Sequence, residues 1–189
     1  MSENIVIVGV GGQGTLLASR ILGSAATAEG YDVKVSEVHG MSQRGGSVVT
    51  YVRYGKQVYA PVVAKGTADA ILAFEELEAY RWIEYLKPGG TLIVNTQNIN
   101  PMPVIMGAMQ YPSDIIEKLR AKNIKVIAVN ALEKAISAGT AKAVNVVLMG
   151  VFAKHSVMRK ETFEKALAAT VPPKFLEVNQ RAFELGYQA

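Results

Sequence analysis

The feature that most constrains this fold is a short apolar run that ends in a glycine-rich turn. Ile5 to Val8 are all β-branched and are followed at once by Gly9. Such a run is typical of a strand that is buried on both faces of a parallel sheet. After the turn, apolar residues recur at helical spacing over residues 15–23. A strand, a turn and a helix within about 20 residues predict the first βα unit of a doubly wound fold.

The turn itself has the spacing G-x-G-x-x-G. Its residues are Gly9, Gly11, Gly12, Gln13 and Gly14, with Val10 between the first two. Glycines allow positive φ angles and let a phosphate approach the backbone, and the next helix directs free N–H groups and its positive dipole end at that space. We therefore predict an anion or nucleotide site here. The alternative is that the glycines only let the helix pack close to the sheet.

A second glycine-rich segment follows the next predicted strand, over residues 38–46. An ordinary dinucleotide-binding domain has no such loop. Its candidate ligand-binding residues are Ser42, Arg44, Gly45 and Gly46. A hydroxyl, a guanidinium and free amides can donate several hydrogen bonds to an anion. Because both loops follow early strands, we expect one shared site at the same sheet edge. The alternative is a surface loop with a solvated arginine.

The rest of the chain alternates strand and helix patterns. Strands are expected at 32–37, 68–74, 91–95 and 125–129, a β-hairpin at 47–53 and 57–63, and helices at 75–86, 113–120, 131–137, 141–153, 160–169 and 174–185. This order predicts an α/β, Rossmann-like three-layer domain with a mainly parallel but mixed sheet, one β-hairpin and a C-terminal helical tail. We find no repeat or linker, so we expect a single domain over residues 1–189.

Residues 95–111 are irregular, because prolines at 101, 103 and 112 argue against a continuous helix. Methionines and prolines on such a loop are typical of an adaptable contact with another chain. The alternative, which we favour at this point, is that Val104, Ile105, Met106 and Met109 fold back onto the core.

The residues available for chemistry are few. The chain has no cysteine, so it holds neither disulfides nor cysteine-ligated zinc or iron–sulfur clusters. His39 and His155 are the only histidines, without metal-ligand spacing, and neither a nucleophile elbow nor a P-loop occurs. His39 is the better functional candidate because it lies in the second glycine loop. Asn145 lies in an apolar helix and needs partners, either neighbouring backbone or the site.

The net charge of +4 comes from lysines and arginines that are scattered along the chain. A nucleic-acid-binding surface would need a basic cluster with interleaved aromatic residues. No apolar run is long enough to span a membrane. We therefore expect neither nucleic acid nor a membrane as partner, and a cytoplasmic location.

The two glycine loops together resemble a known family. Residues 9–14 (GVGGQG), followed one strand later by residues 38–46 (VHGMSQRGG), are similar to the gamma-type subunits of 2-oxoacid:ferredoxin oxidoreductases. The likeness is greatest to the small (beta) subunits of indolepyruvate ferredoxin oxidoreductases. Residues 143–150 (AVNVVLMG) also resemble the asparagine-bearing helix of the family. The likeness covers essentially the whole chain, and the pair of loops is far more specific than G-x-G-x-x-G alone.

This resemblance implies that the cofactors are held by a different subunit. In the family, a large partner subunit carries thiamine diphosphate, Mg and the iron–sulfur clusters, and it passes electrons to ferredoxin. The reaction is the oxidative decarboxylation of a 2-oxoacid to an acyl-CoA. This chain has no cysteine and no Gly-Asp-Gly thiamine diphosphate motif, so the resemblance implies a subunit without redox centres that is inactive alone.

The resemblance also implies where the site residues lie. Gly11, Gly12, Gln13 and Gly14 in the first loop, and Ser42, Arg44, Gly45 and Gly46 in the second, would lie near the partner's active site or the coenzyme A phosphates. No residue is assigned a catalytic or metal-binding role. The 2-oxoacid is not identified by these motifs, and only the likeness to indolepyruvate enzymes indicates an aryl-pyruvate.

Two other functions stay open. A stand-alone Rossmann-type NAD- or flavin-binding oxidoreductase is supported by the glycine spacing and by Glu37, which ends the second strand where a ribose-binding acid is found. The lack of a second, substrate-bearing domain argues against it. A purely structural subunit would have the same glycine loops without any ligand.

Overall fold

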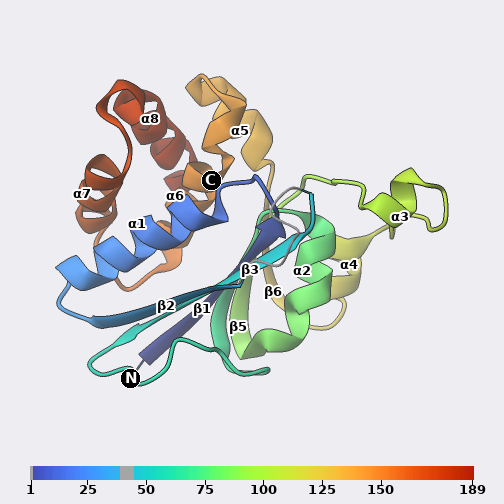
Figure 1. The fold of residues 1–189 in the computed structure, drawn as a ribbon, viewed down its shortest axis with the longest axis horizontal. Coiled ribbons are helices and arrows are strands. Elements are labelled where there is room, and N and C mark those ends of the chain that lie inside the picture. The colour runs from blue at the N-terminus through green and yellow to red at the C-terminus, as the bar shows by residue number, and fades with distance from the viewer. Residues whose placement is uncertain (1, 39–44) are drawn as a thin grey trace.

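The structure is a computed structural model that describes residues 2–38 and 45–189 (Figure 1). Its centre is one six-stranded sheet with the order β2-β3-β1-β4-β5-β6. The strands are β1 (Ser2–Val10), β2 (Asp32–Val38), β3 (Ser47–Gly55), β4 (Ala68–Ala73), β5 (Leu86–Asn95) and β6 (Lys125–Val129). β1, β4, β5 and β6 are parallel, whereas β3 is antiparallel to both of its neighbours. The predicted α/β class with a mixed, mainly parallel sheet is confirmed.

Helices cover both faces of the sheet. The α-helices are α1 (Thr15–Ala28), α2 (Glu76–Trp82), α3 (Met102–Ile105), α4 (Ile115–Arg120), α5 (Ala131–Ala138), α6 (Val144–His155), α7 (Lys160–Thr170) and α8 (Leu176–Tyr187), and the 3-10 turns are η1 (Ile83–Tyr85), η2 (Ala141–Ala143) and η3 (Pro173–Phe175). Figure 1 shows α1 and α5 to α8 on one face, and α2 and α4 on the other. None of the helices in the described part of the chain is long and apolar enough to cross a membrane.

Strand β1 supplies side chains to both cores, as its unbroken apolar run predicts. Ile5 and Ile7 join the core beneath α1 and α6, whereas Val6 and Val8 join the core beneath α2 and α4. All four side chains are completely buried. This arrangement follows from the two-residue period of a strand that lies at the centre of a sheet.

The predicted hairpin between residues 47–53 and 57–63 is wrong, because residues 57–63 do not form a strand. Strand β3 instead pairs with β1 on one edge and with β2 on the other, so its backbone hydrogen bonds are already used. The following segment is held by side chains. Arg53 Nη1 donates to the Ala60 carbonyl at 2.8 Å, and the Val58 N–H donates to the Asp32 carboxylate at 2.8 Å.

Two further expectations need correction. The single helix expected over 75–86 is α2 followed by the turn η1, and residues 87–90 belong to β5, because Leu86 already pairs with Ala68. The expected folding of residues 104–109 onto the core is wrong for Ile105, Met106 and Met109, which are 64 to 70% exposed. The core on that side is already closed by α2, α4 and Tyr111.

Helices α6 and α8 cross at two glycines. A β-carbon added at Gly150 would lie 2.1 Å from the Phe183 carbonyl oxygen, and one added at Gly186 would lie 2.0 Å from the Val147 carbonyl oxygen. The two backbones therefore touch directly. This crossing fixes α6, which is buried from Val144 to Ala153, as its apolar sequence predicts.

Candidate functional site

Two of the predicted loop glycines are required by packing. A β-carbon on Gly9 would lie 2.9 Å from Gln13 Oε1 and 3.0 Å from Phe74 Cβ. Gly14 has a φ of +83°, and a β-carbon there would lie 2.5 Å from Asn145 Nδ2. For Gly9, the close packing of the loop against Gln13 and Phe74 is thus sufficient to explain the residue type, and for Gly14 the positive φ and the contact with Asn145 of α6 are sufficient.

Gln13 shapes the loop from within. The Val10 N–H donates to Gln13 Oε1 at 2.8 Å, and Gln13 Nε2 donates to the Phe74 carbonyl at 3.0 Å. Asn95 Nδ2 donates to that same carbonyl at 3.1 Å, while Asn95 Oδ1 accepts from the Ala131 N–H at 3.0 Å. These bonds join the carboxyl ends of β1, β4 and β5. Both polar ends of the Gln13 side chain are thus engaged inside the fold.

Asn145 holds the junction of the loop and α1 from the opposite side. It is 4% exposed, its Nδ2 donates to the Gly14 carbonyl at 3.2 Å, and its Oδ1 accepts from the Val146 N–H at 2.9 Å. The sequence left open whether this buried amide bonds to neighbouring backbone or faces the site, and the structure shows that it bonds to backbone. That backbone is the glycine loop itself, so Asn145 positions the candidate site.

The second glycine segment meets the first. The Gly11 N–H donates to the Gly46 carbonyl at 2.8 Å, and the Gly45 N–H donates to the Gly11 carbonyl at 3.4 Å. Both segments lie where β1 ends and β3 begins, since Val10 pairs with Ser47. The expected shared sheet edge is therefore found for Gly45 and Gly46. Ser42, Arg44 and His39 lie outside the described residues.

The open side of the first loop faces a cavity of about 430 Å³. Gly12 has a φ of +100°, and no atom of the described chain lies within 4 Å of where its β-carbon would be. The cavity is lined by Gly12, Gln13, Gly14, Gln97, Ile99, Leu132, Ala141, Lys142 and Val144. Among the described residues, no side chain caps α1, and its first turn contains no acidic residue. The positive end of α1 and the Lys142 ammonium therefore both favour an anion.

A smaller cavity, of about 200 Å³, adjoins Gly45 and Gly46 and contains two buried carboxylates. Glu78 is 1% exposed, forms a 2.6 Å ion pair with Arg81 and accepts from Ser47 Oγ at 2.5 Å. Glu75, also 1% exposed, accepts from the Glu78 N–H at 2.9 Å. Glu75 is not among the site residues that the sequence predicts. The feature that could have identified it is its position two residues after the end of β4, because polar side chains at the carboxyl ends of parallel strands lie together at one edge of the sheet.

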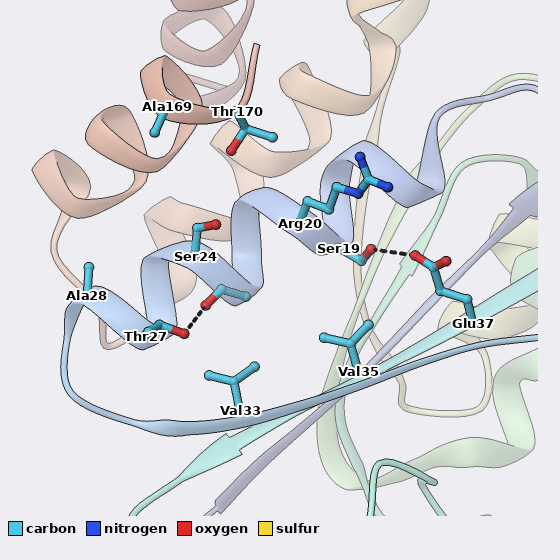
Figure 2. Close-up of a pocket in the computed structure, with 11 residues that line it drawn as sticks. Ser19, Arg20, Ser24, Thr27, Ala28, Val33, Val35, Glu37, Ala169 and Thr170 are labelled. Atoms are coloured by element: carbon cyan, nitrogen blue, oxygen red, sulfur yellow. Dashed lines mark hydrogen bonds between the residues drawn. The ribbon is translucent and has the colours of Figure 1, made fainter.

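A larger cavity, of about 850 Å³, lies elsewhere, between α1, β2 and the end of α7 (Figure 2). Val33 and Val35 form its floor, and Ser19 Oγ donates to Glu37 Oε1 at 3.3 Å. Because β3 separates β2 from β1, Glu37 lies two strands, or roughly 10 Å, from the strand that carries the glycine loop. This geometry differs from a dinucleotide-binding fold, in which the acidic strand is the direct neighbour of β1.

The side chains of this chain do not fit the iron–sulfur clusters of the family that the sequence resembles. The sequence has no cysteine, and the described residues contain no group of three or more histidine, aspartate or glutamate side chains that could hold a metal ion.

Comparison with known proteins places these features in a family. Residues 4–189 match the family model described as pyruvate ferredoxin/flavodoxin oxidoreductase. The chain belongs to this family. The recognition made from the two glycine loops is thereby confirmed: the chain is a subunit of the 2-oxoacid:ferredoxin oxidoreductase type.

Individual members of the family show how much of the chain is shared. Indolepyruvate oxidoreductase subunit IorB of Thermococcus kodakarensis is 47% identical over 98% of this chain and 95% of its own length. The crystal structure of a keto/oxoacid ferredoxin oxidoreductase gamma subunit from Geobacter sulfurreducens has a TM-score of 0.74 at 28% identity and covers 98% of this chain and 96% of its own.

A further solved structure has the same fold as part of a longer chain. The 2-oxoglutarate:ferredoxin oxidoreductase of Magnetococcus marinus, described with 2-oxoglutarate, coenzyme A and succinyl-CoA bound, has a TM-score of 0.77 at 17% identity. The match covers 99% of this chain but only 30% of that one. The same fold therefore occurs both as a separate family subunit and as about a third of a longer chain.

Proposed function

We propose that this chain is the small subunit of a 2-oxoacid:ferredoxin oxidoreductase that acts on indolepyruvate or another aryl-pyruvate. We further propose that its glycine-loop site binds the phosphates of coenzyme A. The substrate assignment is supported by 47% identity to an indolepyruvate oxidoreductase subunit over nearly the whole of both chains.

In this proposal the large partner subunit holds thiamine diphosphate, Mg and the iron–sulfur clusters, and it transfers the electrons to ferredoxin. The overall reaction converts a 2-oxoacid and coenzyme A into an acyl-CoA and carbon dioxide, with two electrons leaving through the clusters. The part of the present chain is to bind and orient coenzyme A so that its thiol reaches the acyl group. The absence of cysteine in this sequence supports placing every cluster on the partner.

The observation that carries the coenzyme A proposal is the environment of Gly12. Its open backbone faces a cavity that also receives the N-terminus of α1 and the Lys142 side chain. Backbone N–H groups at a helix N-terminus and one ammonium group are a suitable set of donors for a phosphate. Gln13, whose side chain is engaged with Val10 and Phe74, would contribute the loop's shape.

The test compares two glycines in the assembled enzyme. Gly12→Ala places a methyl group where the phosphate would approach, and Gly66→Ala is a matched control because Gly66 also has a positive φ and an open β-carbon position. We expect Gly12→Ala to raise the KM for coenzyme A by about tenfold or more, which corresponds to about 1.4 kcal/mol of lost binding. Gly66→Ala should leave this KM at the wild-type value.

The same assay separates the competing functions. If Gly12→Ala and Arg44→Ala both leave an assembled complex with wild-type kinetics, the chain is a structural subunit and the coenzyme A proposal is wrong. If the isolated chain binds NAD or a flavin tightly, the stand-alone Rossmann enzyme is favoured instead.

A further inference from the structure

We infer that residues 100–110, here called the methionine arm, dock into an apolar recess of the large subunit of the same enzyme. This inference rests on the proposed function, because it takes that large subunit as the occupant. Figure 1 shows α3 and its connections extending away from the layers of the fold.

The arm presents a cluster of exposed apolar side chains. Three of the seven methionines of the chain lie within it, and Met102, Ile105, Met106 and Met109 are 62 to 70% exposed. Single exposed apolar residues are ordinary, but a group of four on one projection is typical of a protein contact. Methionine is common at such contacts because its flexible, polarisable side chain adapts to the facing surface.

The arm is a defined element with its own hydrogen bonds. The Met106 N–H donates to the Met102 carbonyl at 2.9 Å, and the Ala108 and Met109 N–H groups donate to the Pro103 carbonyl at 2.9 and 3.1 Å. Gly107, with a φ of +74°, turns the chain back. The backbone that carries the exposed side chains is therefore held in one arrangement before any partner arrives, which lowers the backbone part of the entropy cost of docking.

A single buried carboxylate anchors both ends of the arm. Glu75 Oε1 accepts from the Ile99 N–H at 2.9 Å, before the arm, and from Tyr111 Oη at 2.5 Å, after it. The Tyr111 hydroxyl in turn accepts from the Leu77 N–H at 3.1 Å. Burial and the neighbouring Glu75 carboxylate raise the pKa of Tyr111, so its hydroxyl stays a donor at neutral pH. The base of the arm is thus fixed to the N-terminus of α2.

The chemistry of the arm favours an apolar protein surface as occupant. No charged residue occurs from Pro88 to Ser113, so the arm offers nothing to a nucleic acid or to a charged peptide. Its first residues also border the candidate site, since Pro101 and Met102 line the small cavity together with Gly45 and Gly46. The subunit that brings the redox centres to coenzyme A has to approach this edge, and the arm lies in its path.

The setting of the fold in a longer chain supports the same occupant. In the Magnetococcus enzyme the matched fold is 30% of the chain, so there the fold is joined covalently to the remainder of an oxidoreductase. A separate subunit such as this one needs a non-covalent contact in place of that connection. An anchored projection with an apolar tip provides one.

The experiment measures association of the full-length chain with the large subunit purified from the same host. The test variant is Ile105→Ser/Met106→Ser/Met109→Ser. The matched control is Tyr59→Ser/Val62→Ser, which removes apolar side chains that are 85 and 58% exposed in a different loop. We expect the dissociation constant of the test variant to rise by about tenfold or more, and that of the control to stay within about twofold of wild type. Circular dichroism melting should be unchanged for both variants, because all five side chains are exposed.

Each outcome has a defined consequence. Wild-type affinity in the test variant overturns the inference and leaves the proposed function intact. If light scattering shows a wild-type dimer that the test variant converts into a monomer without loss of affinity for the large subunit, the occupant is a second copy and the inference is likewise wrong. Failure of the wild-type chain itself to bind the large subunit contradicts the proposed function instead.

Discussion

Gly150→Ala gives a direct test of the packing that positions the candidate site. Helix propensity alone predicts that this change stabilises α6 by about 1 kcal/mol, because alanine is the better helix former. The structure predicts the opposite sign. The new methyl carbon would lie 2.1 Å from the Phe183 carbonyl oxygen and 2.8 Å from the Tyr187 backbone nitrogen, whereas real contacts of this kind are at least about 3 Å.

The size of the effect follows from the atoms that collide. Overpacking in a core costs about 1 to 3 kcal/mol, and this site belongs at the upper end because both neighbours are backbone atoms that no change of rotamer can move. Subtracting the propensity gain of about 1 kcal/mol leaves a net loss of about 2 kcal/mol. For a chain of 189 residues this corresponds to a melting temperature lower by about 4 to 8 °C.

The assay is thermal unfolding of the full-length chain followed by far-ultraviolet circular dichroism, with Gly23→Ala as the control. Gly23 is also inside a helix, but its nearest neighbours are Val33 Cγ1 and Val35 Cγ2, both at 3.8 Å. The control should therefore melt at or up to about 4 °C above wild type. If Gly150→Ala also melts at or above the wild-type temperature, α6 and α8 are not in direct backbone contact and our account of the crossing is wrong.

Three other perturbations test the polar contacts of the fold. Glu75→Ala removes the acceptor of all three donors that face Glu75, including both bonds that hold the ends of the methionine arm, so we expect a loss of at least about 1 to 3 kcal/mol of stability and faster proteolytic cleavage in the arm; unchanged cleavage would contradict the anchoring role. Asn145→Ala removes one of the two donors to the Gly14 carbonyl, which keeps the Ala18 N–H, and should cost about 0.5 to 1.5 kcal/mol in urea unfolding; a wild-type midpoint would refute the contribution of this bond. Burial raises the pKa of Tyr51 to about 12. The stabilisation linked to this shift is therefore complete below about pH 10 and is lost as the pH rises from about 10 towards 12. In an alkaline titration followed by ultraviolet absorbance, Tyr51→Phe should unfold at a higher pH than wild type, and an unchanged midpoint would contradict this assignment.

The parts of the fold that the sequence predicted well depend on local patterns. The buried strand at Ile5 to Val8, the glycine turn and helix α1 follow from residues that are neighbours along the chain. The meeting of the two glycine segments was also expected, because both follow early strands. The insertion of β3 between β1 and β2 was not expected, since strand order depends on pairing between residues that are distant in the sequence. Residues 57–63 alternate as a strand would, but both edges of β3 are already paired with β1 and β2.

The contacts of the site needed the structure for the same reason. The engagement of Gln13 depends on the Phe74 carbonyl, and the role of Asn145 depends on the Gly14 carbonyl, which is 131 residues away in the sequence. The exposure of the methionine arm was predicted incorrectly, because its residues are as apolar as the core. These residues are exposed because other elements already cover that core, which the sequence alone does not show.

The most direct test of the central claim is a purification through a tag on this chain from its native host, followed by a viologen-reduction assay on the product. We predict a stoichiometric large partner, iron–sulfur absorbance, and reduction that requires both indolepyruvate and coenzyme A. A chain that elutes alone, without activity towards any 2-oxoacid and with a bound dinucleotide, would contradict the claim.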